Sequence, residues 1–343
     1  MQILEALFIR IFNFVKILLK FFKLNKVIYC FVYSKPFINE FISSLKYDGI
    51  ENRKKNDKYS LTSLMIKQCH VLEKGLAMPN TRAGFGEVIV VKLFNNLNLF
   101  LSKYKIDEMS FMCFNVLKTY CKYNENLGHN IDLITKTLTD LEIKYNITKS
   151  GNSDYGYRLI NRDYIIKLQN SNFAEFVTSR HSVRNFVAKP VSPEVINEAI
   201  KISLAAPSAC NRQSWHVHHY NGKTCSDLLK IQNGNRGFGH LISTILVVSS
   251  DRRSYSGSNE LNLPYVDGGL FAMTLIYSLH YLGLGTCCLN LCLNCNDRKK
   301  FIKTANIKKN ETLIMMIAVG YMPEKFKITD SRKKVFSDII THH

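Results

Sequence analysis

Two short apolar stretches in the second half of the chain constrain the fold most. STILVVSS, residues 243–250, is a β-branched run without a helical period, and ETLIMMIAVGY, residues 311–321, reads as a buried strand. Between them, residues 265–285 (YVDGGLFAMTLIYSLHYLGLG) form a long, very apolar helical pattern that ends at Gly283 and Gly285. Residues 215–220 (WHVHHY) alternate as a further strand, and residues 192–207 begin with the helix-start residues Ser192 and Pro193. Strands separated by helices predict a layered domain in which helices cover a sheet.

The first half of the chain has a different pattern. Apolar residues recur at spacings of three and four in residues 60–78, 88–104, 107–123 and 130–146, which predicts a mainly helical region. Residues 146–158 carry Gly, Ser, Asn and Asp and read as an interdomain loop. We therefore expect two domains, a helical N-terminal extension over residues 1–165 and a sheet domain over residues 166–343.

The charge of the chain favours anionic partners. The 343 residues include 46 Lys and Arg against 27 Asp and Glu, a formal net charge of +19. Such an excess suits nucleic acid, phospholipid headgroups, phosphorylated cofactors or acidic substrates, and general surface basicity is the other reading. No recognisable nucleic-acid-binding module is present, so we do not expect a nucleic-acid partner.

The ten cysteines show no regular framework, which predicts reduced thiols and a cytoplasmic protein. Cys292 and Cys295 have a spacing that can clamp a metal, but a second such pair is missing. We therefore read these two, with Cys287 and Cys288, as small buried hydrophobes and expect no metal site. His216 and His218 share one face of a strand but lack a third ligand.

The first 33 residues carry an apolar helical stripe interrupted by basic residues. No run of 18 uncharged apolar residues exists, so a transmembrane helix is not expected, and no small-residue cleavage site follows. Two readings stay open. The stripe packs on the body of the protein or on a second subunit, or residues 1–40 make a peripheral contact with a membrane.

Two polar segments suggest a ligand. SRHSVRNF, residues 179–186, places a serine between two arginines four residues apart, which suits a phosphate, although a solvated basic patch is the alternative. APSACNRQSWHV, residues 206–217, joins a helix to a strand, where layered folds often bind ligands. Its Asn and Gln amides supply both donors and acceptors for the edge of a heteroaromatic ring. Together the segments predict a phosphorylated, planar cofactor.

Four segments resemble, in order, those of the nitroreductase family: residues 179–186, 206–217, 267–287 and the C-terminal stretch IAVGYMPE…SRKKVFSDII. The resemblance covers about residue 173 to the C-terminus. It implies an α+β fold with a mixed sheet flanked by helices, here preceded by the helical extension. It also implies a homodimer with one FMN at each subunit contact, and hydride transfer from NADH or NADPH to a small-molecule electron acceptor.

The resemblance assigns roles only to residues that match the family's motifs. Arg180, Ser182 and Arg184 correspond to its N-terminal flavin motif, and Arg332 corresponds to a C-terminal basic residue on the phosphate. The sequence departs from the family at Asp330, where many members have lysine, and at Cys288, which replaces a frequent tryptophan. The remaining cofactor-binding residues implied are Pro207, Ser208, Asn211 and Gln213 beside the ring, and the backbone of Leu289 and Asn290 near flavin N5.

These expectations define the function to be tested. Because flavin chemistry needs no protein nucleophile, we expect no catalytic side chain of that kind, and Arg184 is the candidate cation for charge developing near flavin N1. The expected protein is an FMN-dependent oxidoreductase acting on an organic acceptor such as a nitro compound or a quinone. The alternative is a basic flavin-binding or membrane-associated protein that kept the fold without turnover.

One group of charged residues in the N-terminal extension has two possible roles. His70, Glu73, Lys74 and Arg82 lie on a helix and the loop after it. They could form a substrate lid over the flavin, or a structural cluster of salt bridges.

Overall fold

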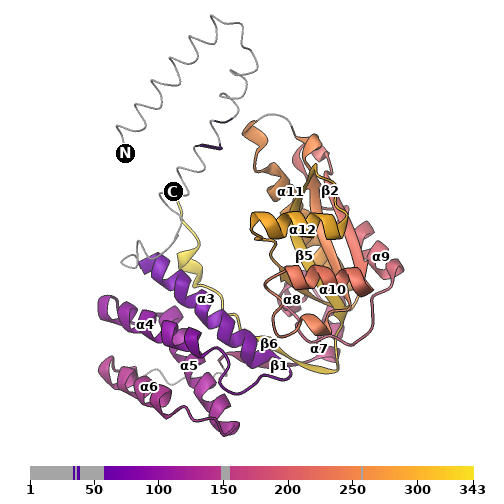
Figure 1. Cartoon of the computed structure of the whole chain (residues 1–343). Coiled ribbons are helices and arrows are strands. Elements are labelled where there is room, and N and C mark those ends of the chain that lie inside the picture. The colour runs from indigo at the N-terminus through magenta and orange to yellow at the C-terminus, as the bar shows by residue number, and fades with distance from the viewer. Residues whose placement is uncertain (1–33, 35–36, 39–57, 148–154, 256–257) are drawn as a thin grey trace, which may run out of the picture.

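The computed structural model describes residues 34, 37–38, 58–147, 155–255 and 258–343 (Figure 1). The apolar stripe of the first 33 residues lies outside this part of the chain, so both readings of it stay predictions. Within the described part, helices that combine the length and the apolar character needed to cross a membrane do not occur.

The four helices expected in the first half are confirmed. They are α3 (Lys58–Ala77), α4 (Glu87–Lys103), α5 (Glu108–Asn126) and α6 (Asp132–Lys144). Helix α5 begins at a capping box in which Asp107 accepts from the backbone of Ser110 and the Ser110 hydroxyl accepts from the backbone of Asp107. Buried residues of these helices, such as Met65, Leu93 and Phe114, form one shared apolar core. This bundle is called the N-terminal helical group below.

The main sheet has four strands in the order β2-β3-β5-β4. They are β2 (Trp215–Asn221), β3 (Thr244–Asp251), β4 (Leu284–Leu289) and β5 (Glu311–Tyr321), and every neighbouring pair is antiparallel. Ser182 forms an isolated parallel bridge with Thr286 at the free edge of β4. The two apolar stretches that opened the sequence analysis are thus the central strands, β3 and β5.

Helices cover both faces of this sheet. Alternate side chains of a strand point to opposite faces. Accordingly Ile245 and Val247 of β3 join the core under α10 (Gly222–Ile231) and α12 (Cys295–Ala305). Leu246 and Val248 join the core under α9 (Pro193–Ser203) and α11 (Leu263–Tyr281). Every residue of β3 is buried, which explains why its sequence shows no polar alternation. The α+β fold expected from the sequence is confirmed.

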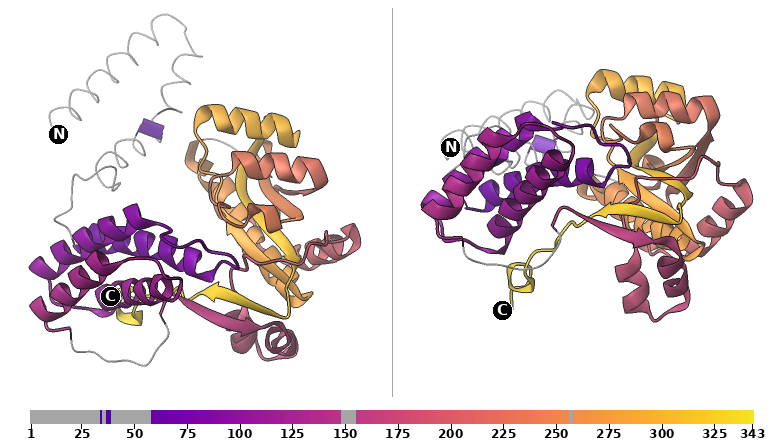
Figure 2. Two further views of the ribbon diagram at one scale, coloured as in Figure 1. Left: turned by 60° about the horizontal axis from the view of Figure 1, so that its bottom comes forward. Right: turned by 90° about the horizontal axis from the view of Figure 1, so that it is seen from below.

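A two-stranded ribbon joins the helical group to the sheet domain (Figure 2). It pairs β1 (Tyr157–Asn161) with β6 (Lys325–Thr329), and α3 packs against both strands. Strand β1 falls inside the region expected to be mainly helical, so the boundary near residue 165 stays a prediction. The short helices α7 (Arg162–Lys167) and α8 (Phe173–Ser179) lead from the ribbon into the sheet domain. Short 3₁₀ turns span Leu168–Asn170, Ala209–Asn211, Gly239–Leu241, Arg252–Ser254, Ser258–Glu260 and Phe336–Asp338.

Candidate functional site

The segment with two arginines lies along the free edge of β4. The backbone N–H of Val183 donates to the carbonyl oxygen of Thr286 at 2.8 Å, and Ser182 forms the parallel bridge to the same residue. A side chain at Gly285 of β4 would crowd this approach, because its Cβ would lie 2.8 Å from Met322 Cγ and 3.0 Å from Val183 Cγ2. Strand β4 therefore holds the motif in a fixed position next to residues 286–290.

Arg184 is a buried cation without a carboxylate partner in the described part of the chain. Arg184 is only 6% exposed to solvent. Its Nη1 lies 3.4 Å from the carbonyl oxygen of Ser182 and 3.5 Å from Oγ1 of Thr329, and both acceptors are neutral. Burying an unpaired charge is costly, and buried charges in proteins are normally paired. The site therefore fits an anionic ligand.

Further cations gather around His181, next to Arg180. The pKa of His181 falls to about 4, because burial disfavours the charged ring and Arg158, Arg180 and Lys333 oppose a further positive charge. The pKa of the buried His280 also falls to about 4, through burial and then through Arg180. This end of the site is electropositive even with both rings neutral, as a phosphate site requires.

The C-terminal segment reaches the same region, but Arg332 is already paired. Its Nε donates to Asp330 at 2.8 Å, and its guanidinium lies 3.8 Å from the ring centroid of Tyr155. Asp330, where the resemblance leads us to expect lysine, also pairs with Arg158 at 3.2 Å. Lys333, which the motif did not point to, is the C-terminal cation whose charge acts on His181.

The far end of β4 is held by Gln232, which also binds the loop GNRGFG, residues 234–239, that the sequence marked only as a turn. Nε2 of Gln232 donates to the carbonyl oxygen of Asn290 at 2.9 Å, and its Oε1 accepts from the N–H of Gly234 at 2.7 Å. Leu289 is buried and Asn290 is exposed. Arg180, Ser182, Arg184, Leu289 and Asn290 are thus brought together along one strand edge.

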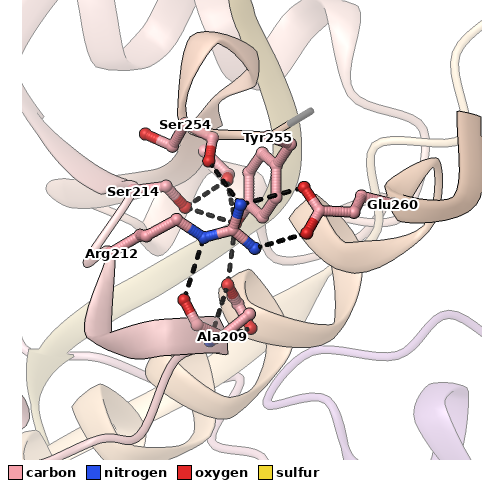
Figure 3. A network of polar contacts seen from close by, with 8 residues as sticks. Ala209, Arg212, Ser214, Ser254, Tyr255 and Glu260 are labelled. Atoms are coloured by element: carbon pink, nitrogen blue, oxygen red, sulfur yellow. Dashed lines mark hydrogen bonds and ion pairs between the residues drawn. The ribbon is translucent and has the colours of Figure 1, made fainter. Parts of the chain in front are cut away.

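The loop over residues 207–213 is fixed by a network of its own (Figure 3). The guanidinium of Arg212 makes two bonds of 2.9 Å to Glu260 and donates to the carbonyl oxygens of Ser254 and Ala209. Asp267, near the start of α11, accepts from the N–H of Ala209 at 3.1 Å and from the hydroxyl of Tyr255 at 2.9 Å. The loop is therefore tied to the beginning of α11.

This network holds a strained backbone. Cys210, Asn211 and Gln213 have φ values of 52°, 54° and 48°, the left-handed region that non-glycine residues rarely adopt. Asn211 and Gln213 are exposed, and Nε2 of Gln213 donates to Oδ1 of Asn211 at 3.2 Å. Pro207 is exposed, whereas Ser208 is partly buried and its hydroxyl accepts from the N–H of Gln213 at 3.0 Å. Strain of this kind often marks a binding loop.

Within one chain this loop lies far from the arginines. Strands β2 and β4 are opposite edges of the sheet, three strand spacings apart, or roughly 14 Å. Along the strands, Trp215 lies level with Thr312 of β5 through Ser250, whereas Thr286 lies level with Val319. That difference adds roughly 20 Å. The structure thus does not bring Pro207, Ser208, Asn211 and Gln213 to Arg180, Ser182 and Arg184 of the same chain.

The cysteine reading was partly wrong. Cys287 is buried, but Cys288, Cys292 and Cys295 are exposed, because they lie near the end of β4, in the loop after it and at the first residue of α12. Over the described residues, His, Cys, Asp and Glu side chains do not gather in threes close enough to hold a metal ion. His218 instead pairs with Glu311, Nε2 to Oε2, at 2.7 Å.

The group noticed in the extension does not form a single cluster. His70 Nδ1 lies 3.9 Å from Glu73 Oε2, whereas Nζ of Lys74 donates to the carbonyl oxygen of Gly234 in the sheet domain at 3.2 Å. Burial lowers the pKa of Lys74, and the charges of Arg184 and Arg236 lower it further. Lys74 therefore lies near Arg184, and the reading of this group as a substrate lid over the flavin stays a prediction.

Part of the chain is similar to known proteins. Residues 177–235 and 225–321 match the model of the nitroreductase family. Over 56 residues the chain is 39% identical to 4-nitrobenzoate reductase of Pseudomonas putida, a match that spans 16% of this chain and a quarter, 25%, of that enzyme. A nitroreductase family protein of Streptococcus pneumoniae is 21% identical, covers 50% of this chain and 100% of its own, and superposes with a TM-score of 0.45. A putative nitroreductase of Bacillus subtilis is 19% identical, with 50% and 99% covered and a TM-score of 0.43.

Proposed function

We propose, from the premise that residues 177–321 form a domain of the nitroreductase family, that this protein is an FMN-dependent oxidoreductase. It would take hydride from NADH or NADPH and pass it to a small organic acceptor such as a nitro compound or a quinone. The observation that carries the proposal is the buried Arg184, which has no carboxylate partner among the described residues and lies at the edge where the family's flavin motif lies.

The residues along β4 fit the two ends of FMN. Arg180, the hydroxyl of Ser182 and the nearby Lys333 supply cationic and neutral donors for the phosphate. Arg184 supplies a positive charge for the pyrimidine edge of the ring, where negative charge develops on reduction. FMN, when bound, supplies the hydride chemistry, and the protein binds, orients and electrostatically stabilises it. Arg332 would contribute less than the resemblance implied, because Asp330 already pairs with it.

A second copy of the chain would supply the missing loop. Val266, Leu270, Met273 and Tyr281 lie at spacings of three, four and eight on α11 and are exposed, which gives this helix an uncovered apolar face. Because Asp267 anchors the loop over residues 207–213 to the start of α11, pairing of this face would carry the loop into the partner. We infer a homodimer in which Asn211 and Gln213 of each subunit reach the ring in the other.

Absorbance spectroscopy of the purified protein tests the function. We expect a yellow protein, or one that takes up added FMN, whose flavin is bleached by NADH or NADPH and recovers its colour with a quinone or a nitroaromatic acceptor. Protein that takes up no FMN refutes the proposal. Bound FMN that neither nicotinamide reduces would instead support the alternative of a flavin-binding protein without turnover.

The dimer has a separate test. Leu270→Glu places a charge on the exposed face of α11, and we expect it to lower the molar mass measured by light scattering and to release FMN. Val88→Glu is the matched control, because Val88 is also a highly exposed apolar residue but lies on α4. A Leu270→Glu protein that stays dimeric and keeps its FMN would contradict the inferred interface.

A further inference from the structure

We propose that Lys74 of α3 is part of the cofactor site, and that its ammonium group contacts the pyrimidine edge of the flavin beside Arg184. The N-terminal helical group would then complete the pocket of the sheet domain. This inference rests on the proposed function, and it adds a residue outside the segments that match the family.

The end of α3 is in contact with the sheet domain. Nζ of Lys74 donates to the carbonyl oxygen of Gly234 at 3.2 Å. One turn later, Met78 packs against the core under α10 and α12, and a Cβ on Gly237 would lie within 2.4 Å of its sulfur. Gly237 has a φ of 88°, so the loop passes close to Met78 in a conformation that suits glycine. The position of Lys74 is therefore fixed on both sides.

This contact places Lys74 between the two ends of the predicted flavin site. Gly234 is bonded through Gln232 to the carbonyl oxygen of Asn290, at the far end of β4. On the other side, the positive charge of Arg184 adds to burial in lowering the pKa of Lys74. Lys74 thus lies near Arg184 and is linked by hydrogen bonds to Asn290.

The surroundings of Lys74 lack a counter-ion within the described residues. Its neighbour Glu73 is buried and lies near His70 and Cys69. Arg184 and Arg236 are instead like charges, and with burial they disfavour the ammonium form. Two cations held together in this way are unfavourable in the free protein and become favourable when an electron-rich group lies between them.

The site has two ends along β4. Because the bridge between Ser182 and Thr286 is parallel, Arg180 lies toward Leu284 and Arg184 lies toward Asn290. Lys74 is tied through Gly234 and Gln232 to the Asn290 end. FMN likewise has two electron-rich centres, the phosphate and the N1–C2 carbonyl edge. Because Arg180 and Ser182 suit the phosphate, the second centre is left for the ring. We therefore assign Lys74 to the ring and not to the phosphate.

The test compares Lys74→Met with Lys67→Met in the full chain. Lys67 is an exposed lysine on the same helix, so its replacement removes the same charge without touching the pocket. Dissociation constants for FMN and for riboflavin are measured by quenching of flavin fluorescence, and the midpoint potential of bound FMN by dye equilibration. Lys74→Arg, which keeps the charge, shows whether charge at this position is sufficient.

We expect Lys74→Met to weaken FMN and riboflavin binding by the same factor, about tenfold, because the contact is with the ring. If the lysine favours reduced over oxidised flavin tenfold, the midpoint potential falls by about 30 mV. Lys67→Met should leave all three values unchanged, and Lys74→Arg should restore most of them. A lysine that only ties α3 to Gly234 would leave the potential unchanged.

Two outcomes overturn the assignment. Wild-type affinity and potential in Lys74→Met exclude a contact with the flavin. A loss of FMN affinity with unchanged riboflavin affinity moves Lys74 to the phosphate. If Lys74→Met does not fold, Lys74→Gln is measured instead, and an unchanged potential there has the same meaning. A wild-type protein that binds no flavin refutes the proposed function itself, which separates that failure from the failure of this inference.

Discussion

Replacing Arg184 with methionine should change the stability of the free protein and its affinity for FMN in opposite directions. Methionine keeps the apolar stem of the side chain and removes the charge. In the free protein the guanidinium is buried, its recorded acceptors are the neutral oxygens of Ser182 and Thr329, and Lys74 adds a like charge. Removing it should therefore stabilise the free protein, by about 1 to 3 kcal/mol.

The loss of ligand binding can be estimated in the same way. A hydrogen bond to a charged group contributes about 1.5 to 3 kcal/mol, so the dissociation constant for FMN should rise by about 10- to 150-fold. At an FMN concentration 1,000 times the wild-type constant, binding stabilises the wild-type protein by about 4.1 kcal/mol. With a constant raised about 100-fold, the same concentration stabilises the variant by only about 1.4 kcal/mol.

Urea unfolding with and without FMN measures both effects. Lys189→Met is the control. Lys189 is exposed, so its replacement removes one positive charge away from Arg184. The reasoning is refuted if the free Arg184→Met protein is less stable than wild type, since the charge would then have a stabilising partner. It is equally refuted if FMN stabilises variant and wild type by the same amount.

Two further predictions follow from the loop and the buried histidine. Glu260→Gln weakens the partly exposed ion pair with Arg212 and should destabilise the protein by about 1 kcal/mol or less. Backbone amide hydrogen exchange should become faster at residues 209–213. Unchanged exchange there would mean that the network of contacts in Figure 3 does not hold the loop. His280 has a folded pKa of about 4 against about 6.5 when unfolded, so the unfolded chain binds more protons between these values and stability is lost as the pH falls from 6.5 to 4. The loss from His280 is about 2 kcal/mol at pH 5, and His280→Gln should show a smaller decrease in urea-unfolding free energy than wild type; an equal decrease would exclude His280 as its source.

Local sequence was sufficient for most secondary structure and for half of the candidate site. The helices α3 to α6 and the strands β3 and β5 could be predicted because their apolar spacing follows the period of each element and depends on few distant residues. Arg180, Ser182 and Arg184 could be predicted together because they lie on one short segment. The loop with Asn211 and Gln213 could also be predicted from sequence, because its polar residues lie on one short segment.

The tertiary structure decided which of these residues lie close to one another. Strand order places the loop over residues 207–213 at the edge opposite Arg184, and the pairing of β1 with β6 joins segments that are distant in sequence. Lys74 reaches the surroundings of Arg184 only because α3 packs on the ribbon and ends against residues 234–237. Contacts of this kind depend on how whole elements pack, and a spacing pattern describes one element at a time. The sequence alone therefore determines which residues can carry charge, and the packing of whole elements determines which of those charges lie close together.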